Sequence, residues 1–122
     1  MKSPYLDLVE KALKISPKIQ FATVCNMLGV VKYTHHRTGA KNLLLHSEGV
    51  KSLKIATRTW KLRNKYASKI GKAEFILVQY GKIKHIAILL DKGHLLYMTT
   101  TKNADHNKII TKATKLKVGK TR

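Results

Sequence analysis

Cationic side chains recur at intervals of three and four residues between positions 51 and 65, a spacing that aligns them along one face of an α-helix. The row consists of Lys51, Lys54, Arg58, Lys61 and Lys65. Glu48 is the last carboxylate before it, so no acidic side chain within the row pairs with these charges. A row of aligned cations is suited to contact successive phosphates, so it is a candidate site for a polyanion. The alternative is a helix face that is only solvated.

The same charge bias extends over the whole chain. Lysine and arginine number 25 against 6 aspartates and glutamates, which gives the 122-residue chain a formal charge of +19. Such a surplus raises the local concentration of any polyanion. Most of these cations are lysines, which act as point charges, whereas arginine supplies the planar fork that reads guanine edges. The charge therefore favours a protein that binds nucleic-acid backbones with little sequence preference, and a lysine coat that only aids solubility is the alternative.

The predicted phosphate contacts continue toward the C-terminus. Lysines at positions 108, 112 and 115 share one face of a predicted helix, and further cations follow in the last residues. The complete set of predicted nucleic-acid-binding residues is Lys51, Lys54, Arg58, Lys61, Lys65, Lys108, Lys112, Lys115, Lys117, Lys120 and Arg122.

Residues with catalytic or metal-binding chemistry are few. His35 and His36 are adjacent, but neither a cysteine nor a carboxylate lies near them in sequence to complete a metal site. Cys25 lies in an apolar run and is expected to be a core residue. The sequence has neither a glycine-rich phosphate loop nor a nucleophile elbow. We therefore expect no enzymatic activity, no cofactor and no bound metal.

Length and composition predict a single domain over 1–116, followed by a basic, disordered tail over 117–122. A chain of this length buries enough surface for a core without disulfides. The unpaired Cys25 indicates a reducing compartment, and we expect a cytoplasmic protein. The N-terminal residues include Asp7 and Glu10 and no long apolar stretch, so neither a signal peptide nor a membrane span is predicted.

The N-terminal half of the chain predicts a helix followed by two strands. Serine and proline at 3–4 are typical of a helix start, and Pro17 ends this helix. The apolar, β-branched segment 19–28 predicts a buried strand, and a hairpin leads into a second strand over 30–34. The polar segment 35–40 is predicted to be a loop or a frayed strand end.

A long helix is predicted over 47–70, with Gly71 as its C-terminal stop. Besides the cationic row it carries two apolar tracks, which are Val50, Leu53, Trp60 and Ala67 on one side and Ile55, Leu62, Tyr66 and Ile70 on a second. Two tracks indicate two packing partners, the protein's own sheet and a second copy of the helix across a dimer interface. The alternative is one wide core stripe.

The C-terminal half predicts three antiparallel strands and a last helix. The strands are expected over 73–80, 83–90 and 95–101, joined by glycine-containing turns. Asn103 or Asp105 can cap the helix, which is expected over 104–116. The predicted fold class is thus α+β in the order α-β-β-α-β-β-β-α, a five-stranded antiparallel sheet with the long helix on one face and the terminal helices on the other.

This arrangement resembles the roadblock/longin-like fold, and most closely uncharacterised archaeal roadblock-like proteins. The resemblance is carried by Ile19-Gln20-Phe21-Ala22-Thr23-Val24, by 53–66 in the long helix, and by Ala104-Asp105-His106-Asn107-Lys108-Ile109-Ile110. It implies a non-catalytic module that often forms homodimers through the long helix and an edge strand and serves as a platform for small GTPases or larger complexes.

Two functions follow from these observations. The first is a homodimeric nucleic-acid binder without sequence preference. The alternative is a homodimeric roadblock-like scaffold or regulator that binds an acidic protein partner, such as a small GTPase or a complex subunit. Attachment to an anionic membrane through the last helix is a third possibility, disfavoured because the apolar face of that helix is small and better used against the sheet.

Overall fold

The computed structural model describes residues 3–91 and 93–116 of the chain. The predicted tail over 117–122, with the predicted nucleic-acid-binding residues Lys117, Lys120 and Arg122, lies outside the described residues. The elements are α1 (Pro4–Ile15), β1 (Ile19–Asn26), β2 (Val31–His36), α2 (His46–Arg63), a short 3-10 turn η1 (Asn64–Tyr66), α3 (Ala67–Ile70), β3 (Phe75–Gln79), β4 (Ile83–Asp91), β5 (His94–Thr101) and α4 (His106–Ala113).

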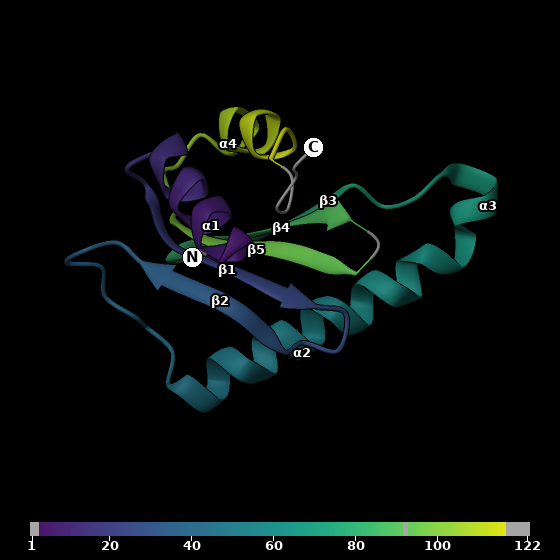
Figure 1. The fold of residues 1–122 in the computed structure, drawn as a ribbon, viewed down its shortest axis with the longest axis horizontal. Helices are drawn as coiled ribbons and strands as arrows, with labels where there is room; N and C mark the ends of the chain where they lie inside the picture. The colour runs from purple at the N-terminus through teal and green to yellow at the C-terminus, as the bar shows by residue number, and fades with distance from the viewer. Residues whose placement is uncertain (1–2, 92, 117–122) are drawn as a thin grey trace.

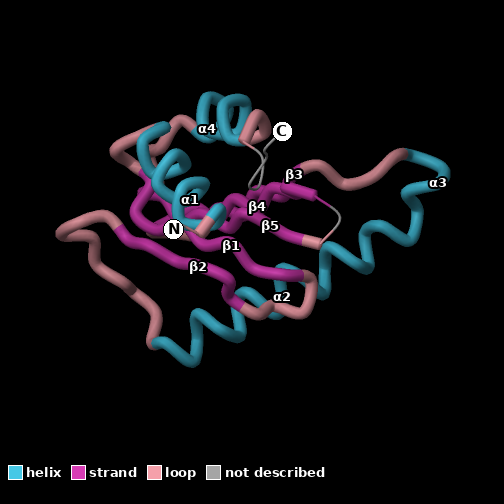
Figure 2. The backbone as a smooth tube through the Cα atoms, in the orientation of Figure 1, coloured by secondary structure: helices cyan, strands magenta, loops and turns pink. Residues whose placement is uncertain are grey.

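The five strands form one antiparallel sheet in the order β2-β1-β5-β4-β3 (Figure 1). Helices α1 and α4 cover one face of this sheet, and α2 runs along the other face. Figure 2 shows the same layering, with helices on both sides of the strands. The predicted fold class and element order are confirmed. Strands β2 and β3 are the two edges of the sheet, so each pairs with one neighbour only.

Each face of the sheet has its own core. On the side of α1 and α4, side chains such as Val9, Ile19 and Ile109 are fully buried against the sheet. On the other side a smaller cluster joins α2 to the sheet through Leu53 and Trp60. Leu53 and Trp60 of the first apolar track thus pack on the sheet, as predicted, whereas Val50 is half-buried and Ala67 lies in α3. The second track is exposed and does not merge with the first into one core stripe.

Helix α1 begins and ends as its sequence predicts. The Ser3 side chain accepts a hydrogen bond from the Tyr5 amide, which satisfies one of the unpaired donors of the first turn. At the other end the Arg37 guanidinium donates to the carbonyl oxygen of Ser16 over 2.9 Å and to that of Ile19 over 2.8 Å. Arg37 therefore holds the link between α1 and β1 together, although its sequence context indicated only a solvated basic loop.

Helix α2 is shorter than predicted. The sequence predicts one helix over 47–70, whereas the structure ends α2 at Arg63, passes through η1 and resumes for one turn as α3. Asn64 marks the break, and its side-chain oxygen accepts a hydrogen bond from the amide of Ala73. Asparagine favours such local bonds over helix continuation. Gly71 adopts a φ of 90°, the conformation that suits glycine at a helix end.

The hairpin between β1 and β2 also differs from the prediction. Strand β1 ends at Asn26 rather than at residue 28, because the Asn26 side chain bonds to the amides of Leu28 and Val30 and so starts the turn. His35 and His36 are the last residues of β2, which agrees with a strand end and not with a loop. Across the described residues, no helix combines the length and the apolar character needed to cross a bilayer.

Candidate functional site

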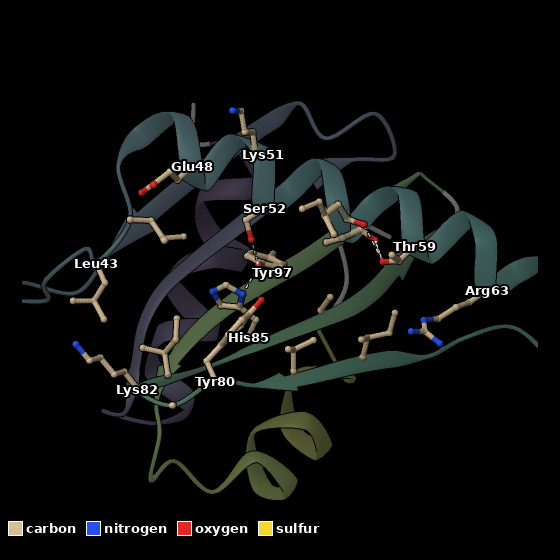
Figure 3. Close-up of a pocket in the computed structure, with 18 residues that line it drawn as sticks. Leu43, Glu48, Lys51, Ser52, Thr59, Arg63, Tyr80, Lys82, His85 and Tyr97 are labelled. Atoms are coloured by element: carbon tan, nitrogen blue, oxygen red, sulfur yellow. Dashed lines mark hydrogen bonds between the residues drawn. The ribbon is translucent and has the colours of Figure 1, made fainter.

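An open groove of about 710 Å³ lies between α2 and the edge strand β3, on the face of the sheet that α2 covers (Figure 3). One wall comes from α2, the other from β3 and the turn after it, and the floor from β4 and β5. Its central side chains are Ser52, Ile55, Ala56, Thr59, Ile76, Val78 and Tyr80. The groove exists because α2 is too narrow to cover the whole sheet and leaves the β3 side open.

Ile55 is the member of the second apolar track that lines the groove, whereas Leu62, Tyr66 and Ile70 lie outside its lining. Leu53, Thr57 and Trp60 are buried on the side of α2 that faces the sheet. The side chains on the other sides of the helix therefore face the groove or water. Ile55 is 61% exposed and Leu62 is 55% exposed. The second track predicted from the sequence is thus an uncovered apolar surface in a single copy of the chain.

The β3 wall combines apolar side chains with an unpaired strand edge. Val78 and Tyr80 line the groove and are exposed, Phe75 is exposed at the start of β3 outside the groove, and β3 pairs only with β4 among the described strands. In the part of the chain that the structure describes, no strand bonds to the outer edge of β3. An exposed, apolar edge strand is the usual place for another strand to add to a sheet.

Three polar side chains form a chain of hydrogen bonds on the groove floor. The Ser52 hydroxyl lies 2.8 Å from the Tyr97 hydroxyl, which in turn lies 2.6 Å from Nδ1 of His85. Figure 3 shows Ser52 reaching down from α2 to this pair. Burial lowers the pKa of His85 below its usual value and raises the pKa of Tyr97 to about 12. The three groups are therefore neutral near pH 7 and tie α2 to β4 and β5.

Charged side chains stand at the ends of the groove. Glu48 lies near the start of α2 and Arg63 at its end, and both line the groove (Figure 3). The Glu48 carboxylate accepts a hydrogen bond of 2.8 Å from the amide of Leu45, which caps the helix. Lys51 and Lys82 add positive charge to the rim. The apolar centre and charged ends resemble the core and rim of a protein–protein interface.

The loop before α2 extends the apolar surface beyond the groove. Leu43, Leu44 and Leu45 are consecutive and exposed, and the first two line the groove. Beneath the same loop a smaller cavity of about 250 Å³ separates the start of α2 from β1 and β2. These leucines were not predicted from the sequence to have a role.

The predicted nucleic-acid-binding residues do not form one surface. Lys51, Lys54, Arg58, Lys61 and Lys65 are exposed on α2 and η1, whereas Lys108, Lys112 and Lys115 are exposed on and just after α4, across the sheet. Figure 1 shows these two helices on opposite faces. Helix spacing aligns residues within one helix, but only the sheet between the helices decides whether two rows meet.

Cys25 and the pair His35 and His36 are the other residues considered for chemistry. Cys25 is fully buried, and burial raises the pKa of its thiol to about 11, so the thiol is inert near pH 7. The rings of His35 and His36 lie 6.3 Å apart at the end of β2. Among residues 3–91 and 93–116, no three histidine, cysteine, aspartate or glutamate side chains are close enough to hold a metal ion.

The residues of the β3 wall were not predicted from the sequence. Val78 and Tyr80 follow the alternating pattern of an ordinary strand. The sequence signal for a binding surface was the apolar run of β3, but the sequence did not show that this strand is at the edge of the sheet. An apolar strand at the centre of a sheet is buried by its neighbours, whereas the same strand at an edge exposes both its bonds and its side chains.

Comparison with solved structures identifies several of the same fold. The gliding protein MglB from Thermus thermophilus matches with a TM-score of 0.76 and 13% identity, over 94% of this chain and 88% of that one. The Roadblock/LC7 domain from Streptomyces avermitilis matches with a TM-score of 0.68 and 15% identity, over 88% and 89%. MglC from Myxococcus xanthus matches with a TM-score of 0.60 and 11% identity, over 91% and 92%. No protein-family model and no curated protein matches the sequence.

These matches correct the first functional prediction. The prediction of a nucleic-acid binder is wrong, because the matching folds are a Roadblock/LC7 domain, the gliding protein MglB and MglC, and none of these is described as a nucleic-acid binder. The error has a physical cause. A surplus of lysine attracts any polyanion and does not distinguish a phosphate backbone from an acidic protein. The expected kinship to archaeal proteins stays a prediction.

Proposed function

Because the chain has a roadblock/longin-like fold, we propose that it is a non-catalytic protein-interaction module that forms a homodimer and presents a platform to a protein partner. The observation that carries this proposal is the apolar groove between α2 and β3, continuous with the unpaired edge of β3. The exposed side chains of its two walls belong to a regular helix and a regular strand. A second copy of the chain supplies both an apolar helix for the groove and a strand for the edge.

The placement of residues on α2 suits a two-fold axis near the middle of the helix. Glu48 lies seven residues before Ile55, and Arg63 lies seven residues after Ala56. Two antiparallel copies of α2 that cross at Ile55 and Ala56 therefore place Glu48 of each protomer beside Arg63 of its partner. The small side chain of Ala56 allows close approach of the two helices.

The same axis suits the edge strand. Two copies of β3 related by a two-fold axis run antiparallel, which is the pairing already used throughout the sheet. The exposed residues Phe75 and Val78 then become covered, and the two sheets form one continuous sheet. A solved structure of MglB that this chain matches, with a TM-score of 0.76 and 13% identity, is described as having a tetrameric arrangement, which supports self-association.

Charge is distributed in a way that permits this dimer. Each copy carries a formal charge of +19, so two copies repel each other. Lys54, Arg58 and Lys61 do not line the groove, and they lie on the flank of α2 that a second copy leaves free. Lys51 and Lys82 do lie on the groove rim, so part of the repulsion acts at the interface, and salt screens the rest.

Sedimentation equilibrium at physiological salt tests the proposal directly. We expect the wild-type chain to change from monomer to dimer as its concentration rises through the micromolar range. A monomer mass at all concentrations up to the millimolar range would contradict the proposal. A cytoplasmic location stays a prediction from the unpaired Cys25.

A further inference from the structure

The turn between β1 and β2 presents apolar side chains to water on an ordered support. Leu28 is 71% exposed and Val30 is 51% exposed. The Asn26 side-chain oxygen accepts hydrogen bonds from the amides of both residues, over 2.9 and 3.0 Å, and the Asn26 amide donates to the Val30 carbonyl over 3.0 Å. The exposure of these two side chains is thus built into the turn.

This turn is held against α2 at Lys54. Gly29 has a φ of 82°, and a Cβ atom placed on it would lie 3.0 Å from Cγ of Lys54 and 3.4 Å from its Cα. Only glycine allows the turn to lie so close to the helix in this conformation. Figure 1 shows the turn beside α2. The exposed Leu28 and Val30 are therefore neighbours of the cationic row.

The cations beside the turn lack acidic neighbours on their own helix. Lys54, Arg58 and Lys61 are exposed on α2, and the one carboxylate of α2, on Glu48, caps the helix. Asp7 on α1 and Asp105 at the start of α4 belong to the other face of the sheet. Asp91, in the β4–β5 hairpin at the same end of the sheet as the turn, lies 3.0 Å from Nδ1 of His94. No acidic helix therefore lies beside this flank to offset its positive charge.

We propose that Leu28 and Val30, together with Lys54, Arg58 and Lys61, form a docking surface for an acidic protein segment that carries apolar side chains among its carboxylates. This inference rests on the proposed function, because it identifies the chemistry of the partner that the platform binds. The surface lies on the flank of α2 away from the groove, so both copies of a dimer keep it free. The carboxylates complement the row, and the apolar residues cover the turn.

A protein segment fits this surface better than a lipid bilayer does. The row is linear and follows one helix, which matches the width of a single extended or helical segment. The apolar part consists of two side chains on a turn held close to the helix, whereas stable membrane attachment needs a larger apolar area or a second anchor.

Two synthetic peptides of equal length and charge separate the apolar contact from simple attraction between charges. One repeats Glu-Glu-Leu-Glu and the other repeats Glu-Glu-Ser-Glu, each labelled with fluorescein and titrated with the full chain by fluorescence anisotropy at physiological salt. We expect the leucine peptide to bind at least about tenfold more tightly, since burial of one or two leucines readily exceeds the roughly 1.4 kcal/mol that a tenfold change represents.

Three variants assign the binding to the proposed residues. The Leu28→Ser/Val30→Ser variant is expected to bind the leucine peptide no better than the serine peptide. The Lys54→Glu/Arg58→Glu variant should lose about tenfold or more in affinity for both peptides. The matched control, Lys108→Glu/Lys112→Glu, makes the same charge change on α4 and should alter both affinities less than about twofold.

Equal affinity of the wild-type chain for the two peptides would overturn the proposal, as would a loss in the α4 control equal to that in the α2 variant. Amide shifts at Leu28 and Val30 in the wild-type chain, measured by NMR during the leucine-peptide titration, supply a readout that needs no variant. Unchanged shifts at both residues with the peptide bound also overturn the proposal.

Two further measurements separate this docking surface from a lipid-binding site and from the proposed homodimer. If vesicles of one part phosphatidylglycerol to three parts phosphatidylcholine bind through Leu28 and Val30 while the leucine peptide does not, the surface is a lipid site and the proposal fails. Sedimentation equilibrium on the same samples tests the homodimer. A monomer that prefers the leucine peptide contradicts the dimer alone, and a dimer without that preference contradicts the docking surface alone.

Discussion

Replacement of Ile55 by serine tests the groove at its proposed centre. Ile55 is 61% exposed in a single copy, so the change leaves the core of the monomer intact. Full burial of an isoleucine side chain is worth about 1.5–3 kcal/mol, and covering the exposed part is therefore worth about 1–2 kcal/mol. Because a two-fold axis buries the residue from both protomers, the dimer loses about 2–4 kcal/mol, or about two orders of magnitude in Kd.

The assay is sedimentation equilibrium over a concentration series, with circular dichroism to confirm that the variant folds. The matched control is Leu28→Ser, which makes a similar apolar-to-polar change at a side chain that is 71% exposed in the turn between β1 and β2, beside the other flank of α2. We expect the control to dimerise like the wild-type chain. An Ile55→Ser variant with a wild-type Kd, or a control that weakens the dimer equally, would show that the groove is not the dimer interface.

Three further tests address the fold that positions the site. Lys84→Met should lower the free energy of unfolding, measured in urea, by about 1–3 kcal/mol. The buried Lys84 ammonium donates to the Ala104 carbonyl over 2.8 Å, and the variant leaves that oxygen unpaired. An unchanged urea midpoint would contradict this. Gly29→Ala should destabilise the chain by about 1–2 kcal/mol, because its φ is 82° and the new Cβ would meet α2. Gly49→Ala, in a helix with open space around it, should instead stabilise by up to about 1 kcal/mol, and thermal unfolding of this pair should move in opposite directions. Because burial lowers the pKa of His85, the unfolded chain takes up a proton before the folded one as pH falls below the usual value of 6.5; stability in urea should decrease from about pH 7 to about pH 5.5, and by less in His85→Phe.

Local sequence signals were sufficient for the elements and for much of their order. The serine and proline before α1, Pro17 after it and the glycine turns between the C-terminal strands act within a few residues of themselves. Their effect does not depend on distant parts of the chain. Asp105, one of two predicted caps for α4, does cap that helix by accepting a bond from the Lys108 amide.

Predictions failed where a distant contact decides the outcome. Arg37 looks like part of a solvated basic loop, yet its guanidinium binds carbonyls of the α1–β1 link and of β1 that lie far away in sequence. Lys84 carries no signal in the sequence that assigns it a partner, yet it is buried beneath the start of α4. A long side chain can reach a partner that periodicity does not reveal, and only the packed structure shows which lysine is exposed.

The sequence by itself determined the α+β class, the amphipathic faces of the helices and the presence of a second apolar track on the long helix, because all of these follow from the spacing of residues along one element. The tertiary structure alone decided that β3 is a sheet edge, that this edge and Ile55 of the second track bound one groove, and that the cations of α2 and α4 lie on opposite faces. These are relations between elements that are far apart in the chain. They depend on strand order and helix placement, which the packing of the whole domain sets.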